Sequence, residues 1–332
     1  MPVILNRAFF MLLLATLIPA TTKADILSIA WDNDLLTGED RGYTNGVRIS
    51  YLTAAAEDSG KPSSTLARTG KEALARLPGI GQAENKHALS FSLRQLMVTP
   101  ADIANPELQP DDIPYAGHLS LSSTLWSWNA DTITGFGAHL GVIGPESGAE
   151  ASQKWVHKLT GSTTPRGWDH QLGTDVVGGI QAAHGRRVFH TGNTGAIQQQ
   201  VSVVGSTLIS SFRTTAKTGL VWRIGRDLPM NLVPDYAGTA STIALPGSFS
   251  GSPTSWSVFV GLGVEYVAYS YLEDNSGPFQ FKESPLLGQV GIGGSWQWNR
   301  TQVSLTLRAT TGEEESSKDN FSFGTLFVSW AL

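Results

Sequence analysis

Apolar and polar residues alternate strictly in many short stretches of the chain, a pattern that predicts antiparallel β-strands. In the stretch 87–95, Leu89, Phe91 and Leu93 alternate with small or polar residues. The stretch 119–128 repeats the pattern with leucines against serines and ends in Trp126-Ser127-Trp128. Successive side chains of a strand point to opposite faces, so each stretch has one apolar face and one polar face.

The alternation divides the chain into about 12 strands, an even number that favours an all-β, transmembrane antiparallel β-barrel. The final strand places Leu326, Val328 and Trp330 on one face, as is typical of outer-membrane barrels. The expected strands cover residues 25–31, 43–51, 87–95, 119–128, 132–143, 169–189, 196–212, 214–226, 256–271, 285–298, 301–310 and 321–332.

Paired tryptophans near strand ends predict an aromatic girdle at the membrane interface. The two pairs are Trp126 with Trp128 and Trp296 with Trp298. A soluble β-sandwich also shows alternation, but it has no need of such rings.

The N-terminal residues 1–24 predict a signal peptide. Arg7 supplies the positive charge, residues 8–18 form an apolar core, and residues 22–24 form a small-x-small cleavage site. The remaining chain, residues 25–332, is expected to form one barrel with a catalytic loop or helix insertion. It contains no run of about 20 consecutive apolar residues, so no membrane-spanning helix is expected.

Composition supports a barrel in lipid and disfavours one class of partner. The chain has a net charge of -5, which disfavours nucleic acid as a partner. It has 36 glycines and 10 tryptophans, and only 15% of its residues are charged. Small residues and aromatic rings with few charges suit a wall that faces lipid. Without cysteine, the exported chain must be held together by its own core or by its own closed sheet.

One long stretch, residues 141–168, interrupts the strands and predicts a short loop helix near residues 146–160. Pro145 and Ser147 provide a start signal and Gly161 a stop signal. Gln153 and His157 lie four residues apart and therefore share one helix face. A histidine there is suited to act as a general base. The alternative is that His157 is only a polar residue on a loop helix.

A second polar group is expected where the first two strands meet. Asn33 and Asp34 follow the first strand, and Thr44 and Asn45 open the second. If these strands pair, the four side chains converge at one rim, where Asp34 is suited to hold a hard cation such as calcium. The alternative is an ordinary Asx-rich turn. No EF-hand loop, zinc-type ligand spacing or GxSxG motif is present.

Several motifs occur together in a fixed order, and with them the chain resembles the outer-membrane lipid A 3'-O-deacylase (LpxR-like) family. The likeness runs from the signal peptide to the last strand and is densest from Asp32 to Leu172. Its motifs are Asn33-Asp34, Tyr43-Thr44-Asn45-Gly46, Thr99-Pro100-x-Asp102, Pro114-Tyr115-Ala116-Gly117, Leu140-Gly141-Val142-Ile143-Gly144-Pro145, Gln153-x3-His157 and Gly167-Trp168-x2-Gln171-Leu172.

The resemblance implies a bacterial outer-membrane hydrolase that removes the 3'-linked acyloxyacyl chain of lipid A, the membrane anchor of lipopolysaccharide. The family's catalytic positions match His157, Gln153, Asn33, Asp34 and Thr44. The resemblance also implies a divalent cation, usually calcium, for which Asp34 is the expected ligand. One departure stands out, because a family member that compares well has a carboxylate six residues after the catalytic histidine, and this chain has Thr163 there.

The resulting hypothesis is that His157 takes a proton from a water molecule that attacks the ester carbonyl. A cation near Asp34, with Asn33 and Thr44, stabilises the oxyanion, and Gln153 positions the histidine or the water. Two other classes stay open: a non-enzymatic barrel, either a channel or an inactive family member, and a soluble secreted binding sandwich. A monomer is the default expectation.

Overall fold

The structure is a computed structural model and describes residues 24–33, 42–55, 65–82, 84–229, 249–275, 277–312 and 321–332. The predicted signal peptide, residues 1–24, lies almost entirely outside the described residues. No helix in these ranges is long and apolar enough to cross a bilayer.

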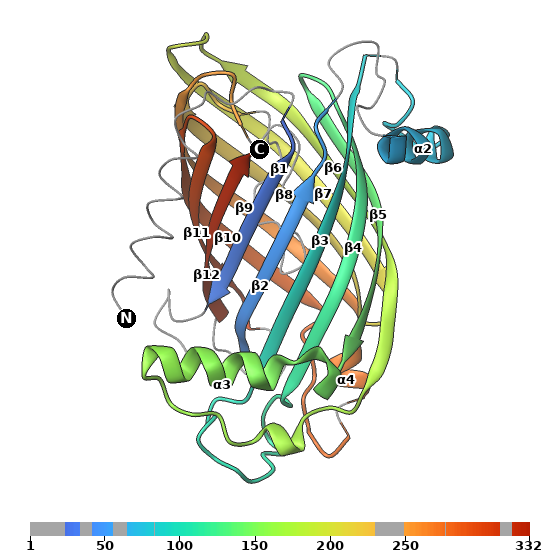
Figure 1. Cartoon of the computed structure of the whole chain (residues 1–332), viewed down its shortest axis with the longest axis vertical. Helices are drawn as coiled ribbons and strands as arrows, with labels where there is room; N and C mark the ends of the chain where they lie inside the picture. Colours follow the sequence, from blue (N-terminus) through green and yellow to red (C-terminus); the bar gives the residue numbers. More distant parts are fainter. Residues whose placement is uncertain are drawn as a thin grey trace.

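Twelve strands and a few short helices make up the described chain (Figure 1). In chain order they are β1 Ile26–Asn33, β2 Gly42–Leu52, α2 Thr65–Leu74, β3 Lys86–Thr99, β4 Ala116–Trp128, β5 Thr132–Ile143, the 3-10 helix η3 Pro145–Ser147, α3 Ala149–Thr160, the 3-10 helix η4 Trp168–His170, β6 Asp175–Thr191, β7 Ile197–Ser210, β8 Arg213–Arg226, β9 Thr254–Ser270, α4 Tyr271–Asp274, β10 Leu286–Trp298, β11 Thr301–Thr310 and β12 Phe321–Ala331.

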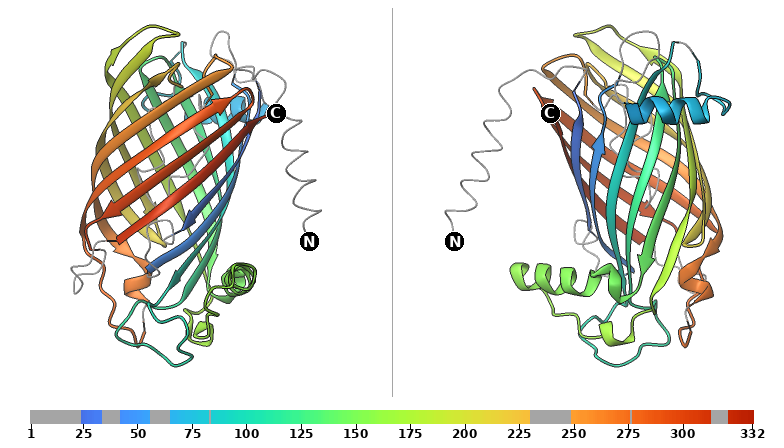
Figure 2. Two further views of the ribbon diagram at one scale, coloured as in Figure 1. Left: turned by 90° about the vertical axis from the view of Figure 1, so that its left-hand side faces the viewer. Right: turned by 45° about the vertical axis from the view of Figure 1, so that its right-hand side comes forward.

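Each strand pairs antiparallel with its neighbours in sequence, and β1 pairs with β12, so the sheet closes into a barrel (Figure 2). The predicted 12-stranded antiparallel barrel is confirmed. The largest error in a predicted strand boundary is at β6: residues 169–174 are not part of this strand, which starts at Asp175, and η4 occupies Trp168–His170.

An apolar ring covers the outside of the wall. Ile29, Ile49, Leu93, Leu121 and Leu140 are register neighbours on five consecutive strands. Their exposed fractions rise from 39% at Ile29 to 64% at Leu140. Side chains in register point to the same face of a sheet, so this row is a continuous aliphatic band that suits contact with lipid.

Polar and charged side chains line the inside of the wall. Glu265 is buried there, with its carboxylate 3.2 Å from the Lys217 Nζ, 3.6 Å from an Arg213 Nη and 3.8 Å from an Arg308 Nη. Gln289 also donates a hydrogen bond to this carboxylate. Buried charges that pair in this way offset part of their desolvation cost. The distal part of the lumen keeps a cavity of about 110 Å³, enough for a few water molecules.

Trp126 and Trp128 belong to this interior, so their assignment to an aromatic girdle is wrong. Both are buried within an apolar cluster that also contains Ile26 and Phe327. The outward positions of β4 are the odd-numbered ones, such as Leu121, and the even-numbered tryptophans therefore point inward. Trp126 Nε1 donates to the Ser90 hydroxyl. The other predicted pair, on β10, is exposed, with 64% of Trp296 accessible.

The two ends of the barrel differ. With an even number of strands, β1 starts and β12 ends at the same end, called the terminal end here, and the opposite end is the distal end (Figure 1). The terminal end carries α2, which packs outside β3 and β4. The distal end carries α3, η3, η4 and α4 (Figure 2).

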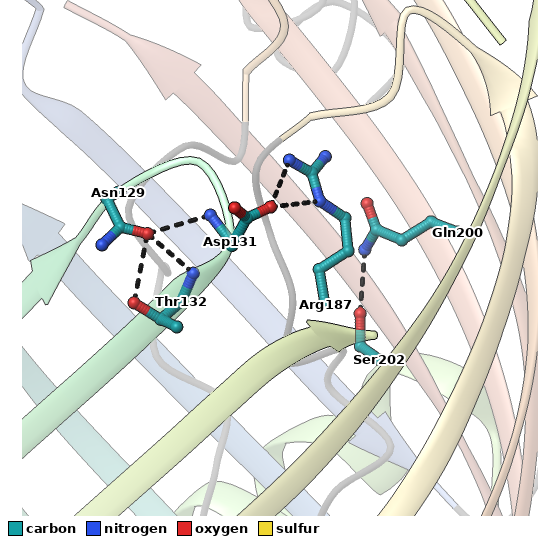
Figure 3. Close-up of polar contacts among 6 residues, drawn as sticks. All are labelled: Asn129, Asp131, Thr132, Arg187, Gln200 and Ser202. Carbon is teal, nitrogen blue, oxygen red and sulfur yellow. Dashed lines mark hydrogen bonds and ion pairs between the residues drawn. The ribbon is translucent and has the colours of Figure 1, made fainter. Parts of the chain in front are cut away.

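At the terminal end, the β4–β5 turn is fastened to β6 (Figure 3). The Asn129 side-chain oxygen accepts from the backbone N–H groups of Asp131 and Thr132 and from the Thr132 hydroxyl. Arg187 donates to the Asp131 carboxylate at 2.9 and 3.1 Å. Nearby on β7, Gln200 donates to Ser202. The Asx turn and its short connection fix the register of β4 against β5, and the Arg187–Asp131 ion pair links this turn to β6.

Candidate active site

A row of outward-facing positions crosses four strands near the distal end. Asn33 is in register with Asn45, Asn45 with Met97, and Met97 with Gly117. Asn33 lies four residues after the outward Ile29, so both point to the same face. Unlike Ile29, Asn33 is buried. Met97 and Gly117 are buried as well, so these three positions of the row are covered on the outside of the barrel.

Two further predicted site residues are next to this row in the sequence. The backbone of Thr44 lies in β2 at a shift in register between β2 and β3. Such irregularities in a ladder change the direction in which nearby side chains point. Asp34, the predicted cation ligand, and the side chain of Thr44 lie outside the described residues.

Helix α3 covers the β4 end of this row. Ala149 at its start packs with Met97, Ile103, Tyr115 and Trp168 in a small apolar cluster on the outer wall. The Tyr115 and Trp168 rings lie 5.0 Å apart. Gln95 Nε2 also donates to the Ser147 carbonyl at 2.7 Å. These contacts hold the start of the helix outside the barrel.

The predicted loop helix near residues 146–160 is confirmed as η3 followed by α3. Gly148 connects the two with a left-handed backbone, φ 67°. Gly161 ends α3 with φ 75°, and its N–H donates to the His157 carbonyl. Helices commonly end with a residue in the left-handed conformation, and glycine is preferred there because it has no Cβ.

Gly117 allows the close approach of α3 to the wall. A Cβ at this position would lie 2.1 Å from the Ser147 Oγ and 2.4 Å from the Ala149 Cβ. We therefore expect Gly117→Ala to displace the start of α3 by overpacking, at a cost of about 1–3 kcal/mol. Limited trypsin digestion of the folded barrel checks this, since cleavage after Lys154 and Lys158 should become several-fold faster.

Gly173→Ala is the matched control, because a Cβ there would meet no atom within 4 Å. Equal cleavage rates in the two variants would contradict the contact between Gly117 and α3.

The length of α3 matches the width of the row. Eight residues separate Ala149 from His157, about 12 Å of helix. Three strand spacings separate Gly117 on β4 from Asn33 on β1, about 14 Å. Figure 1 shows α3 starting beside β4 and extending toward the side of β2 and β1. The helix therefore extends from the Gly117 end of the row toward β1, while the strands that it packs against are β4 and β3.

The ring of His157 is fixed by the chain that returns from α3. Its Nδ1 lies 2.5 Å from the Thr163 carbonyl oxygen. A carbonyl oxygen only accepts hydrogen bonds, so Nδ1 carries the proton and Nε2 of the neutral ring carries the lone pair. The Ser162 N–H donates to the His157 carbonyl, which stabilises the same turn. This arrangement leaves Nε2 as a base on a partly exposed side chain.

Gln153 is almost completely buried on α3, and its side-chain oxygen accepts a 2.7 Å hydrogen bond from Trp168 Nε1. Its Nε2 has no hydrogen-bond acceptor in the part of the chain that the structure describes. A buried amide donor without an acceptor is costly unless a ligand or water completes it. Gln153 thus does not bond to His157; it is held by Trp168 and presents a donor.

Sequence reasoning missed two partners at this site. The Thr163 carbonyl belongs to the main chain and has no residue signature. Trp168 was visible within the Gly167-Trp168 motif, but nothing in its spacing indicated a bond to Gln153.

The two ends of the loop are also joined. The Thr174 hydroxyl donates to the Glu146 carboxylate, and this hydrogen bond lowers the pKa of Glu146. The Arg166 N–H donates to the Ile103 carbonyl, and the Leu172 N–H to the Tyr115 carbonyl. The loop that carries His157 is therefore anchored to the wall and to the loop between β3 and β4.

The donor set near Asn33 decides what kind of metal suits the site. Among the described residues, no three His, Cys, Asp or Glu side chains gather as a metal site. What β1 offers at its end is the amide oxygen of Asn33 beside the carboxylate of Asp34 in the sequence. Amide and carboxylate oxygens are hard donors that suit calcium rather than zinc.

One solved structure shares this fold. The chain is similar to the solved structure of LpxR from Salmonella typhimurium, with a TM-score of 0.75 and 17% identity over 92% of this chain and 100% of that chain. It also aligns with the β-domain of the Bordetella autotransporter BrkA at a TM-score of 0.44 and 10% identity, over 93% of this chain and 98% of that one. No curated protein matches the chain.

The sequence pattern of one family, described as outer membrane protein LpxR, matches residues 8–332. This match spans the barrel, the loop with α3 and every predicted site residue. The protein is therefore placed in the outer membrane, as expected. The chain belongs to the outer membrane protein LpxR family.

Proposed function

We propose that this protein is a lipid A 3'-O-deacylase, a carboxylic ester hydrolase that removes the 3'-linked acyloxyacyl chain of lipid A in the outer membrane. The observation that carries the proposal is the hydrogen bonding of the His157 ring. Its Nδ1 is committed to the Thr163 carbonyl, and its Nε2 is left as a base. Membership of the LpxR family supports the same activity.

In the proposed reaction, His157 Nε2 accepts a proton from a water molecule as the water oxygen attacks the ester carbonyl. The imidazolium then returns the proton to the leaving alkoxide, which leaves as the sugar hydroxyl. Proton transfer by a positioned histidine contributes roughly 10²–10⁴-fold to the rate. No serine nucleophile is required.

Buried amides supply donors around the reacting carbonyl. The Gln153 Nε2 donor is oriented by its bond to Trp168 and is proposed to hold the attacking water or the carbonyl oxygen. Asn33 and Thr44 are proposed to contribute from the wall side. Preorganised donors stabilise a developing oxyanion more strongly in a dry site than in water.

A divalent cation, with calcium as the expected ion, fits the donors at the end of β1. Asp34 is the proposed ligand, with the amide oxygen of Asn33 beside it. When bound, the cation would polarise the ester carbonyl as a Lewis acid.

The departure at Thr163 is proposed to leave the base intact. A threonine stands where the compared family member has a carboxylate, yet the main-chain carbonyl of this threonine holds the His157 ring. Tautomer and orientation of a catalytic histidine depend on the acceptor at its other nitrogen. A carbonyl acceptor supports the orientation but adds no negative charge to stabilise the imidazolium.

Mass spectrometry of lipid A tests the proposal. Cells that express the chain are expected to show lipid A lighter by one 3'-linked acyloxyacyl group, and cells without it are not. Unchanged lipid A together with ion conductance in planar bilayers would favour a channel instead. The buried charges around Glu265 and the apolar cluster around Trp126 occupy the lumen and speak against a channel.

A further inference from the structure

Helix α3 exposes two large apolar side chains on one side. Trp155 is 64% exposed and Leu159 is 60% exposed, and they lie four residues apart, so their side chains are neighbours. Ala149 and Gln153 form the buried side. Exposed apolar side chains that lie together mark sites of contact with another protein or with a membrane.

The adjacent side of α3 is basic. Lys154 and Lys158 are both exposed, and Lys154 lies 2.5 Å from Glu150 in an i,i+4 pair. With 100° of turn per residue, the Lys154–Lys158 side is about a quarter-turn from the Trp155–Leu159 side. The exposed surface of α3 is thus divided lengthwise into an apolar side and a basic side.

The handedness of the helix decides which side faces the bilayer. α3 runs from β4 toward β1 along the outside of the wall (Figures 1 and 2). Its buried side packs on Met97 of β3 through Ala149 and on Trp168 of η4 through Gln153. Residues of a right-handed helix follow one another clockwise when viewed from its N-terminus. This turns the Trp155–Leu159 side toward the terminal end, where the strands span the membrane, and the Lys154–Lys158 side toward the distal end.

The wall beyond α3 continues the apolar surface. Ile49, Leu93 and Leu121 are exposed on the outer faces of β2, β3 and β4, the strands nearest the helix (Figure 1). Since a barrel inserted from the periplasm keeps its termini there, the distal end is extracellular. The medium beside the apolar side of α3 is therefore the outer leaflet.

We propose that α3 is an interfacial helix that inserts Trp155 and Leu159 among the acyl chains of the outer leaflet, while Lys154 and Lys158 contact the phosphates of its glycolipid headgroups. The occupant is thus the anionic lipid leaflet itself, not a protein partner. Helices with an aromatic and aliphatic side beside a lysine side bind membrane surfaces in this way. The consequence for catalysis, that His157 is held at the depth of the lipid ester, rests on the proposed function.

Site-directed spin labelling tests the insertion without any measurement of activity. The chain has no cysteine, so Trp155→Cys, Leu159→Cys and Lys158→Cys each give one label in proteoliposomes that contain lipopolysaccharide. Labels at 155 and 159 are expected to be accessible to oxygen and shielded from an aqueous nickel complex. The label at 158 is expected to show the reverse, and a label on Leu121→Cys gives the reference for lipid contact.

Two outcomes would overturn the proposal. One is full exposure of positions 155 and 159 to the nickel complex. The other is spin–spin broadening between copies, which would make a second protein chain the occupant.

An activity comparison then tests the catalytic consequence. The double variant Trp155→Ser with Leu159→Ser is expected to raise the apparent KM for lipid A in vesicles by about tenfold, because it removes two interfacial anchors. With lipid A in detergent micelles, its kcat is expected to stay within about twofold of the unmodified protein. Leu108→Ser, an exposed apolar residue in the loop between β3 and β4, is the matched control and should change neither value.

The two proposals fail in different ways. If the unmodified protein is inactive but the labels at 155 and 159 report lipid contact, the deacylase proposal is refuted and the interfacial helix is supported. An active protein with aqueous labels at both positions would remove the interfacial helix alone.

Discussion

Replacing His157 by alanine is expected to lower the kcat of lipid A deacylation by roughly 10³-fold, within the range that general-base catalysis contributes. The variant removes the Nε2 lone pair, and with it the only base assigned to the attacking water. Helix α3 should persist, since it is held by the packing of Ala149 on the wall and by the bond of Gln153 to Trp168, and not by His157. The measurement is the initial rate of acyl release by purified, folded protein in detergent.

His170→Ala is the control for this variant. His170 is an exposed histidine in the same loop, at the end of η4, and its replacement should change kcat by less than about threefold. A His157→Ala protein with the full rate, and with the folded barrel verified by its heat-modifiable migration, would show that the base lies elsewhere.

The barrel was predictable because its wall repeats one simple rule. Alternation fixes which residues of a strand share a face, and Leu89, Leu93 and Leu121 follow that rule over long stretches. The rule does not say which face is outside. Trp126 and Trp128 illustrate this, because aromatic residues fill the lumen of this barrel as well as its exterior. Only the register with the neighbouring strands assigns them to the interior.

The site was predictable in part. Two local signals predicted α3: the helical spacing of Gln153 and His157, and the stop signal at Gly161. The helix forms where these signals place it. The approach of α3 to the wall depends instead on an absent side chain at Gly117, and the ring of His157 on a main-chain carbonyl. Neither leaves a residue-type signature in a single sequence. Only the paired strands bring Asn33 into one row with Gly117.

Excess EDTA is expected to lower the deacylation rate of the purified protein on the order of 10²-fold, and added calcium should restore it. Stabilisation of a developing oxyanion by a bound cation amounts to several kcal/mol, and each 1.4 kcal/mol is a factor of ten in rate. Because EDTA also strips cations from lipid A phosphates, the substrate is treated and dialysed identically in every reaction. The measurement is the rate as a function of free calcium.

The matched variant for this titration is Asn33→Ala. Asn33 is buried beside the proposed ligand Asp34, and loss of its amide oxygen should move the half-maximal calcium concentration upward by about tenfold, the scale on which neighbouring groups tune metal sites. Full turnover in EDTA would mean that these oxygens bind no catalytic cation. The negative charge that develops on the ester oxygen would then be stabilised by the amide donors alone. The main donor would be Gln153, whose buried Nε2 has no acceptor among the described residues.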